Sequence, residues 1–199
     1  FVKKNNPNIN IKVGPSESMS KSKKNVVDPE YIIQNYGADS VRLFILSDSP
    51  PEKDVQWSEQ GMVSSYKFIQ KLWSLHNEIK NKISNESKNK TSEELERFTN
   101  QMVAKITNNL EKFNYNVIIA NMYETYNYLI GYLKKNNNSI SLKNYKKILI
   151  CFSPVIPHFS SECLSEIGAS ENIIWPSYDA NELEERDVNI VVQINGKKR

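Results

Sequence analysis

The sequence is poor in the residues that build many kinds of functional site. It contains only two cysteines, Cys151 and Cys163, and two histidines, His76 and His158. The cysteines lie in apolar helical stretches and have no further ligands at a metal-binding spacing, so we expect reduced core side chains and neither a disulfide framework nor a metal site. We interpret His158, which follows a proline, as a packed or capping residue. We interpret His76 as lying at the edge of a helix face.

Long apolar runs and a signal peptide are also absent. No stretch reaches the 18 apolar residues of a membrane-spanning helix. Together with the reduced cysteines, this predicts a cytoplasmic protein that does not enter a membrane. The chain starts with Phe1 and reads as a strand at both ends, so we expect a piece of a longer protein. The net charge of +3 permits a nucleic-acid partner but does not argue for one.

The positive charge gathers near the start of the chain. Six lysines in residues 1–25 face a single carboxylate, Glu17, and the densest part is the loop 16–25, "SESMSKSKKN". Small serines let backbone N–H groups approach anionic oxygens, and lysine suits terminal phosphates. Composition alone still favours a solvated basic loop over a loop that closes on a polyphosphate.

The apolar periodicity beyond this loop predicts helices. "DPEYIIQNYG" reads as a short helix with Asp28 as its N-cap, and Asp39 is expected to cap the next one. Apolar residues at spacings of three and four then predict long antiparallel helices, which pack as a bundle. Strands are expected at "NINIKV" and in "VNIVVQINGKKR", where Asn-Gly signals a hairpin. The long helices are expected over residues 58–84, 92–113, 117–135 and 141–168, the last interrupted by Pro154 and Pro157.

Several blocks, taken in order, resemble the class I aminoacyl-tRNA synthetases. "MSKSKKNVVDP" is similar to that family's Lys-Met-Ser-Lys-Ser loop and the Asp-Pro helix after it, and "YGADSVRLF" is similar to the next helix. "SPPEKDVQWSEQG", "YKFIQKLWSL", "FSPVIPHFSSEC", "WPSYD" and "VVQINGKKR" resemble blocks of the leucine-specific members. The resemblance covers essentially the whole chain.

The resemblance implies a mainly α fold: an antiparallel helical bundle of the anticodon-binding type. The bundle would be preceded by the end of a Rossmann-type α/β catalytic domain and followed by the first strand of a small C-terminal domain. We expect the boundaries at 1–50 for the end of the catalytic domain with its loop and connector, 51–186 for the tRNA-binding bundle, and 187–199 for the C-terminal segment.

The resemblance also implies a reaction. The full enzyme would be a monomer that activates leucine with ATP and Mg²⁺ to leucyl-adenylate and transfers the leucine to tRNA(Leu). The family's paired-histidine "HxGH" loop and its editing domain are missing from these 199 residues, so the chain alone is expected to be inactive. The alternative is a helical module that binds RNA and does no chemistry.

Residue by residue, the family loop assigns Lys21 as the catalytic residue. The ATP phosphates would be held by Met19, Ser20, Lys21 and Ser22. Ser18 stands where the family has its first loop lysine, and either Lys23 or Lys24 could take over that role.

Two further lysines are candidates for contact with tRNA. Lys67 and Lys71 lie four residues apart on one helix face, where they could follow a phosphate backbone or simply be solvated. The three tryptophans, Trp57, Trp73 and Trp175, are expected to be core anchors.

Overall fold

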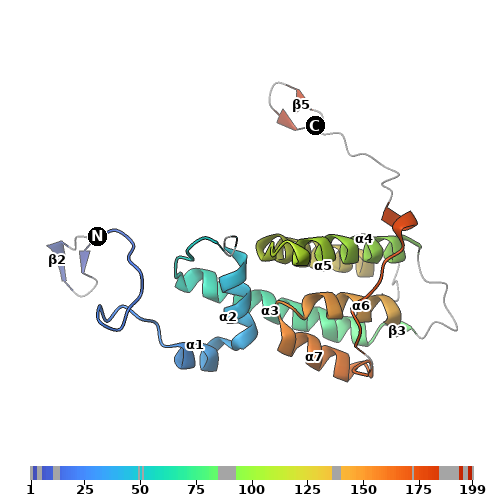
Figure 1. The fold of residues 1–199 in the computed structure, drawn as a ribbon, viewed down its shortest axis with the longest axis horizontal. Coiled ribbons are helices and arrows are strands. Elements are labelled where there is room, and N and C mark those ends of the chain that lie inside the picture. Colours follow the sequence, from blue (N-terminus) through green and yellow to red (C-terminus); the bar gives the residue numbers. More distant parts are fainter. Residues whose placement is uncertain are drawn as a thin grey trace.

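The computed structural model describes residues 2–3, 6–10, 14–48, 50, 52–84, 93–135, 140–171, 173–183, 193–194 and 197–198. Within these ranges the chain is mainly helical, which confirms the predicted fold class, and the long helices lie side by side in a bundle (Figure 1). The helices are α1 (Pro29–Tyr36), α2 (Ala38–Ser47), α3 (Glu59–Lys80), α4 (Glu93–Glu111), α5 (Tyr115–Lys134), α6 (Leu142–Phe152), α7 (Pro157–Glu166) and the 3₁₀ turn η1 (Ala180–Leu183).

Within the described residues the strands form three short pairs. β1 (Val2–Lys3) and β2 (Asn6–Asn10) are antiparallel, as are β5 (Gln193–Ile194) and β6 (Lys197–Lys198). The second pair confirms the predicted hairpin near the C-terminus. The first overlaps the predicted strand at 8–13, of which residues 11–13 lie outside the described ranges. β3 (Ile83–Ser84) pairs in parallel with β4 (Ile140–Ser141) and joins the end of α3 to the start of α6.

One apolar core runs through the bundle. It contains the two cysteines, which are free and completely buried, as predicted. Burial raises the pKa of both thiols to about 12, so neither is a nucleophile at neutral pH. The largest fully buried side chains of this core include Ile79, Leu95, Ile106, Ile118, Met122, Ile140, Ile148, Leu149, Ile156 and Leu164.

A second, smaller core joins α1 and α2 to the start of α3. Ile32, Phe44 and Met62 are its buried members, and the half-buried Trp57 packs edge-on against Phe44 with ring centroids 5.3 Å apart. Gly61 permits this close packing, because a Cβ there would lie 2.6 Å from the Phe44 ring. Trp57 therefore acts as the predicted anchor, but for the connector rather than the bundle.

The short helix α1 begins and ends where the sequence predicts. The Asp28 carboxylate accepts the backbone N–H of Glu30 at 3.0 Å, and Gly37 ends the helix at a φ of +79°. Ser58 caps α3 in the same way, by accepting from Gly61 at 3.1 Å. α3 was expected to reach residue 84 but ends at Lys80, because the next residues pair with β4 instead of continuing the helix.

The prediction that Asp39 caps its own helix is wrong. Gly37 is the N-cap of α2, and Asp39, in the first turn, caps α7 instead. Its carboxylate accepts the backbone N–H of His158 at 3.3 Å, the Nδ1–H of the same residue at 2.9 Å and the N–H of Phe159 at 2.6 Å. One turn later, Arg42 donates to the carbonyl oxygens of Pro154 and Val155 at 2.8 and 3.0 Å. Asp39 and Arg42 together form what we call the α2 clamp on the α6–α7 corner.

The prediction that His76 lies at the edge of a helix face is also wrong. Its side chain is completely buried. Its Nε2 lies 3.0 Å from Glu166 and its Nδ1 lies 2.9 Å from the Tyr145 hydroxyl. Glu166 also accepts from Lys80 at 2.7 Å. Since a carboxylate only accepts, the neutral ring carries its hydrogen on Nε2, and Nδ1 accepts from Tyr145. This network ties α3 to α6 and α7.

Removing the Asp39 carboxylate should destabilise the protein. Asp39→Ala leaves the first N–H groups of α7 without their acceptor in a buried place, and we expect a loss of about 2–3 kcal/mol in the free energy of unfolding. Asp39→Asn keeps one acceptor oxygen and should lose less. Urea denaturation measures both. Asp48→Ala, at the exposed C-terminal end of the same helix, is the control and should change stability little. Equal effects at the two positions would contradict the capping role.

The His76 network should make stability depend on pH. Burial lowers the pKa of His76, so between that pKa and the unfolded value of about 6.5 the unfolded chain binds more protons. Lys80, and then His76, lower the pKa of Glu166, whose contribution is lost at still lower pH. The free energy of unfolding should therefore fall below pH 6.5, by at most ~1.4 kcal/mol per pH unit for this histidine.

Urea titrations at pH 7.5 and 5.5 test this dependence. His76→Gln should flatten the decrease, whereas the control His158→Gln should keep it. An equally steep decrease in the His76→Gln variant would show that other groups cause the pH dependence.

Candidate functional site

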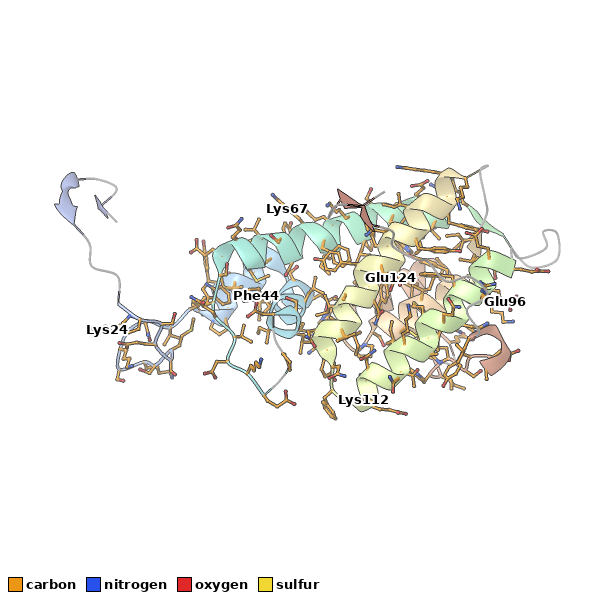
Figure 2. The ribbon with its side chains drawn as sticks, turned by 90° about the horizontal axis from the view of Figure 1, so that it is seen from above. Lys24, Phe44, Lys67, Glu96, Lys112 and Glu124 are labelled. Carbon is orange, nitrogen blue, oxygen red and sulfur yellow. The ribbon has the colours of Figure 1, made fainter. Side chains whose placement is uncertain are left out.

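The serine-lysine loop lies on the surface just before α1. Residues 14–26 are exposed, apart from the half-buried Ser20. Gln56, from the segment before α3, donates to the Ser16 hydroxyl at 3.3 Å and so connects the start of the loop to the connector. Figure 2 shows Lys24, in this loop, at a distance from the bundle.

The loop is held in shape by the side chain of Asn25. Its Oδ1 accepts the backbone N–H of Ser20 at 2.8 Å, and its Nδ2 donates to the carbonyl of Ser18 at 3.4 Å. We call these two bonds the Asn25 staple. Between the residues that it joins, the chain forms a turn in which the backbone N–H groups of Lys23 and Lys24 donate to the carbonyls of Ser20 and Lys21, both at 3.2 Å. The Ser20 hydroxyl lies 3.1 Å from that of Ser22. The hydroxyls of Ser20 and Ser22 therefore bond within the turn and help to shape it.

The three loop lysines have different surroundings. Lys23 donates to Glu17 at 2.8 Å in an exposed ion pair. Lys24 has a φ of +52°, a left-handed conformation that costs a lysine about 1–2 kcal/mol. Among the residues described, neither the Lys21 nor the Lys24 ammonium has a hydrogen-bond or ion-pair partner. An anion at Lys23 must compete with Glu17, whereas the Lys21 and Lys24 ammonium groups are both available, and of these two only Lys24 has a left-handed backbone.

The loop's predicted site residues are close to one another, but the candidate RNA contacts lie elsewhere. Lys67 and Lys71 are exposed on α3, and Lys67 projects away from the neighbouring helices (Figure 2). Neither has an ion-pair partner within the described ranges. Two unpaired cations one helical turn apart form what we call the lysine strip, which is able to bind successive phosphates.

Trp73, on the same helix, is not the core anchor that the sequence predicts, since 37% of its surface is exposed. Trp175 is half-buried against the bundle, and its Nε1–H donates to the Thr107 hydroxyl at 2.9 Å.

Trp73 borders a cavity of about 630 Å³ between α2, α3 and α7. This cavity, here called the α3–α7 pocket, was not predicted, because its walls come from segments far apart in the sequence. In the loop, the sequence reasoning also missed Glu17 and Asn25. The one available signal was that both have polar side chains in or next to the recognised block, Asn25 within it and Glu17 just before Ser18.

None of the helices in the described part of the chain has the length and apolar character needed to cross a lipid bilayer.

Comparison with known proteins shows two family matches. Residues 92–199 match the family described as the anticodon-binding domain of tRNA ligase, and residues 12–58 match the class I tRNA synthetases for isoleucine, leucine, methionine and valine. The second match contains the stapled loop.

Curated relatives include leucine–tRNA ligases from Agrobacterium fabrum, Sinorhizobium medicae and Brucella suis, which are 38%, 37% and 35% identical over 95% of this chain. The chain spans 23–24% of the length of these relatives.

A solved structure of similar fold is a LeuRS of Agrobacterium radiobacter K84 in a ternary complex with tRNA and LeuAMS. It is 25% identical, has a TM-score of 0.72, and the match covers 91% of this chain and 25% of that one. The sequence resemblance, the helical bundle and both family matches agree. The chain therefore belongs to the anticodon-binding domain family of the tRNA ligases and is a relative of the leucine–tRNA ligases.

Proposed function

We propose that this chain is part of a cytoplasmic, monomeric leucine–tRNA ligase that activates leucine with ATP and transfers it to tRNA(Leu). The observation that carries the proposal is Lys21, a cation without a partner in the described residues, on a loop whose shape Asn25 fixes. The loop lies inside the segment that matches the class I synthetases. The leucine specificity is supported by the curated relatives.

The proposed role of Lys21 follows from the charge that develops in the reaction. The leucine carboxylate attacks the α-phosphorus of ATP, the bond to the β-phosphate oxygen breaks, and pyrophosphate leaves with the bonding electrons. A fixed ammonium beside the β- and γ-phosphates stabilises this growing negative charge. Ser20, Ser22 and the backbone of Met19 would border the phosphates. Mg²⁺ belongs to the proposal as the ion that accompanies ATP and neutralises part of its charge.

Lys23 is the better candidate for a second phosphate contact than Lys24. Its ammonium lies beside Glu17. Glu17 directly precedes Ser18, the position at which the family has its first loop lysine. Exposed ion pairs of this kind contribute only about 0–1 kcal/mol, so a triphosphate could displace Glu17. Lys24 has a left-handed backbone, a conformation in which glycine is the usual residue. Within the loop, no hydrogen bond or ion pair holds the Lys24 side chain.

The bundle would dock tRNA along α3. The lysine strip presents two exposed positive charges, and the structural relative was solved with tRNA. In this division residues 1–50 end the catalytic domain, 51–186 form the tRNA-binding bundle, and 187–199 begin a further small domain.

Removing the Lys21 charge should slow leucine activation. In a full-length leucine–tRNA ligase that contains these 199 residues, Lys21→Ala should lower the rate of adenylate formation by about a hundred- to thousand-fold, with a smaller rise in the KM for ATP. Lys21→Arg should restore little of the rate, because the planar guanidinium of arginine does not replace the compact ammonium of lysine. Pre-steady-state adenylate formation measures this step. Lys53→Ala removes an equal charge outside the loop and should leave the rate unchanged. A near-normal rate for Lys21→Ala would refute the role.

Neutralising the lysine strip should weaken RNA binding without affecting activation. Changing Lys67 and Lys71 together to Gln removes two phosphate contacts, so the plot of log affinity for tRNA against log salt should become shallower by about 1.5. Leucine-dependent exchange of pyrophosphate into ATP should stay constant, since it does not need tRNA. The control changes Lys53 and Lys112 to Gln. An unchanged tRNA affinity at low salt would identify the strip as a solvated helix face.

A further inference from the structure

The α3–α7 pocket has no role in the activity proposed above, and aromatic rings form much of its wall. Trp73 and Phe159 meet edge-to-face with ring centroids 6.2 Å apart. Phe159 is almost fully buried, whereas Trp73 is partly open to solvent. Tyr36 and Ile69 add further apolar wall. The accessible face of the indole suits a flat group or a cation, because the faces of an aromatic ring carry negative charge density.

The charged side chains that line the pocket are both acidic, Asp39 and Glu162. The Asp39 carboxylate is occupied, since it accepts three N–H groups in the α2 clamp. Glu162 is exposed and has no ion-pair partner in the parts of the chain that the structure describes. The lysine strip does not offset this charge, because Lys71 follows the pocket-lining Gln70 by about 100° around α3, on the side away from the pocket. The pocket therefore attracts a cation and repels phosphate.

Two contacts between α3 and α7 place Glu162 close to the exposed indole. Trp73 meets Phe159, and His76, one turn later on α3, lies 3.0 Å from Glu166. Glu162 lies between these two contacts on α7 and one turn before Glu166, so it is on the face that α7 turns towards α3. A carboxylate thus stands beside an accessible aromatic ring.

The hydrogen-bond acceptors of the pocket favour a guanidinium over an ammonium. His158 lies one turn before Glu162, and its Nδ1–H donates to Asp39, so Nε2 of the neutral ring is a second acceptor. A guanidinium is planar, carries five N–H donors, stacks on aromatic rings and is less strongly hydrated than an ammonium. It can lie flat on Trp73 and still donate to acceptors at the edge of the ring. Arginine is therefore the side chain that fits this pocket.

The pocket lies at the junction of the two segments that match known families. Its α2 wall, residues 36–40, belongs to the class I synthetase match, and its α7 wall belongs to the anticodon-binding match. Binding sites occur preferentially at such domain junctions. The chain spans only 23–24% of the length of its leucine–tRNA ligase relatives. Under the proposed function, most of the protein that could reach this junction therefore lies outside these residues.

We propose that the α3–α7 pocket binds the guanidinium of an arginine from a part of the same protein outside these 199 residues. The inference rests on the proposed function, which makes the chain a piece of a longer ligase. The guanidinium stacks on Trp73 and donates to the Glu162 carboxylate, and His158 accepts a further N–H. This contact holds the junction of connector and bundle against the rest of the protein.

The first experiment tests whether the pocket of the 199-residue chain selects a guanidinium. An NMR titration follows the indole N–H signal of Trp73 while N-acetyl-arginine amide, Nα-acetyl-lysine amide or N-acetyl-citrulline amide is added. The arginine probe should bind at least about threefold tighter than the lysine probe, and the uncharged citrulline probe should not bind. Equal binding of the arginine probe and either other probe would overturn the proposal.

Variants of the same chain locate the binding. Glu162→Gln should weaken the arginine probe roughly tenfold, because a charge-assisted hydrogen bond is lost. The matched control is Glu59→Gln, which removes an exposed carboxylate from the first turn of α3, outside the pocket, and should leave the affinity unchanged. Equal affinities of the two variants would show that the probe binds elsewhere and would overturn the proposal.

The second experiment identifies the occupant in the full-length protein that contains these residues. The photocrosslinker p-benzoylphenylalanine replaces Trp73, and mass spectrometry locates the crosslinked peptide. We expect a crosslink within the same polypeptide, outside the 199 residues and next to an arginine, which is lost when that arginine is changed to Gln. A crosslink to a separate protein, to a segment without arginine, or only within the 199 residues would overturn the proposal.

Leucine-dependent exchange of pyrophosphate into ATP by the unsubstituted full-length protein tests the proposed function separately. Exchange without the expected crosslink would overturn the pocket proposal alone. The expected crosslink without exchange would overturn the proposed function and leave the arginine contact in place.

Discussion

The α2 clamp is the contact on which the arrangement of the other parts depends. Asp39 and Arg42 lie three residues apart, so both side chains leave the same face of α2 and reach the two sides of the α6–α7 corner. The carboxylate meets the N–H groups and the positive end of the α7 dipole, while the guanidinium meets the carbonyl groups just before it. Since α2 also shares the small core with α1 and α3, the clamp fixes the connector against the bundle. It thereby fixes the loop before α1 relative to the lysine strip on α3.

The positive charges on the surface of this molecule are partly paired with carboxylates and partly unpaired. Several surface lysines lie near carboxylates, among them Lys82 with Glu78, Lys105 with Glu124, and Lys143 with Glu96. Such pairs contribute little to stability, but they reduce the local attraction for a polyanion. Within the described ranges the side chains of Lys21, Lys67 and Lys71 lack such partners, and so do those of Lys24, Lys53, Lys112 and Lys134. The lack of a partner therefore leaves a lysine available to an anion but does not by itself mark a binding site.

The features that the sequence predicted correctly are those that local chemistry decides. Asp28, Pro29 and Gly37 bound α1 through bonds within a few residues, and the apolar spacing of α3 to α7 is enough to predict a bundle. The errors at Asp39 and His76 concern side chains whose partners are more than 60 residues away. Asp39 looked like a cap for its own helix because Asp is common there, but its acceptors serve residues 119 and 120 positions later. His76 looked peripheral because its partners, Tyr145 and Glu166, come from other helices. The function proposed for the loop was inferred from the order of its residues. The bonds of Asn25 that hold the loop in shape were seen only in the structure.

Helix α3 shows how one segment can serve several roles without conflict. With 3.6 residues per turn, successive side chains point about 100° apart, so neighbouring positions face different surroundings. His76 points into the bundle, Trp73 borders the pocket, and Lys71 lies in solvent, all within two turns. The buried network at His76 fixes the rotation of the helix about its axis, because rotating the helix would separate the imidazole ring from both Tyr145 and Glu166. That rotation in turn determines how far Trp73 opens to the pocket and where the lysine strip points. The buried polar contact thus sets the geometry of the surface that would meet RNA, although it touches no ligand itself.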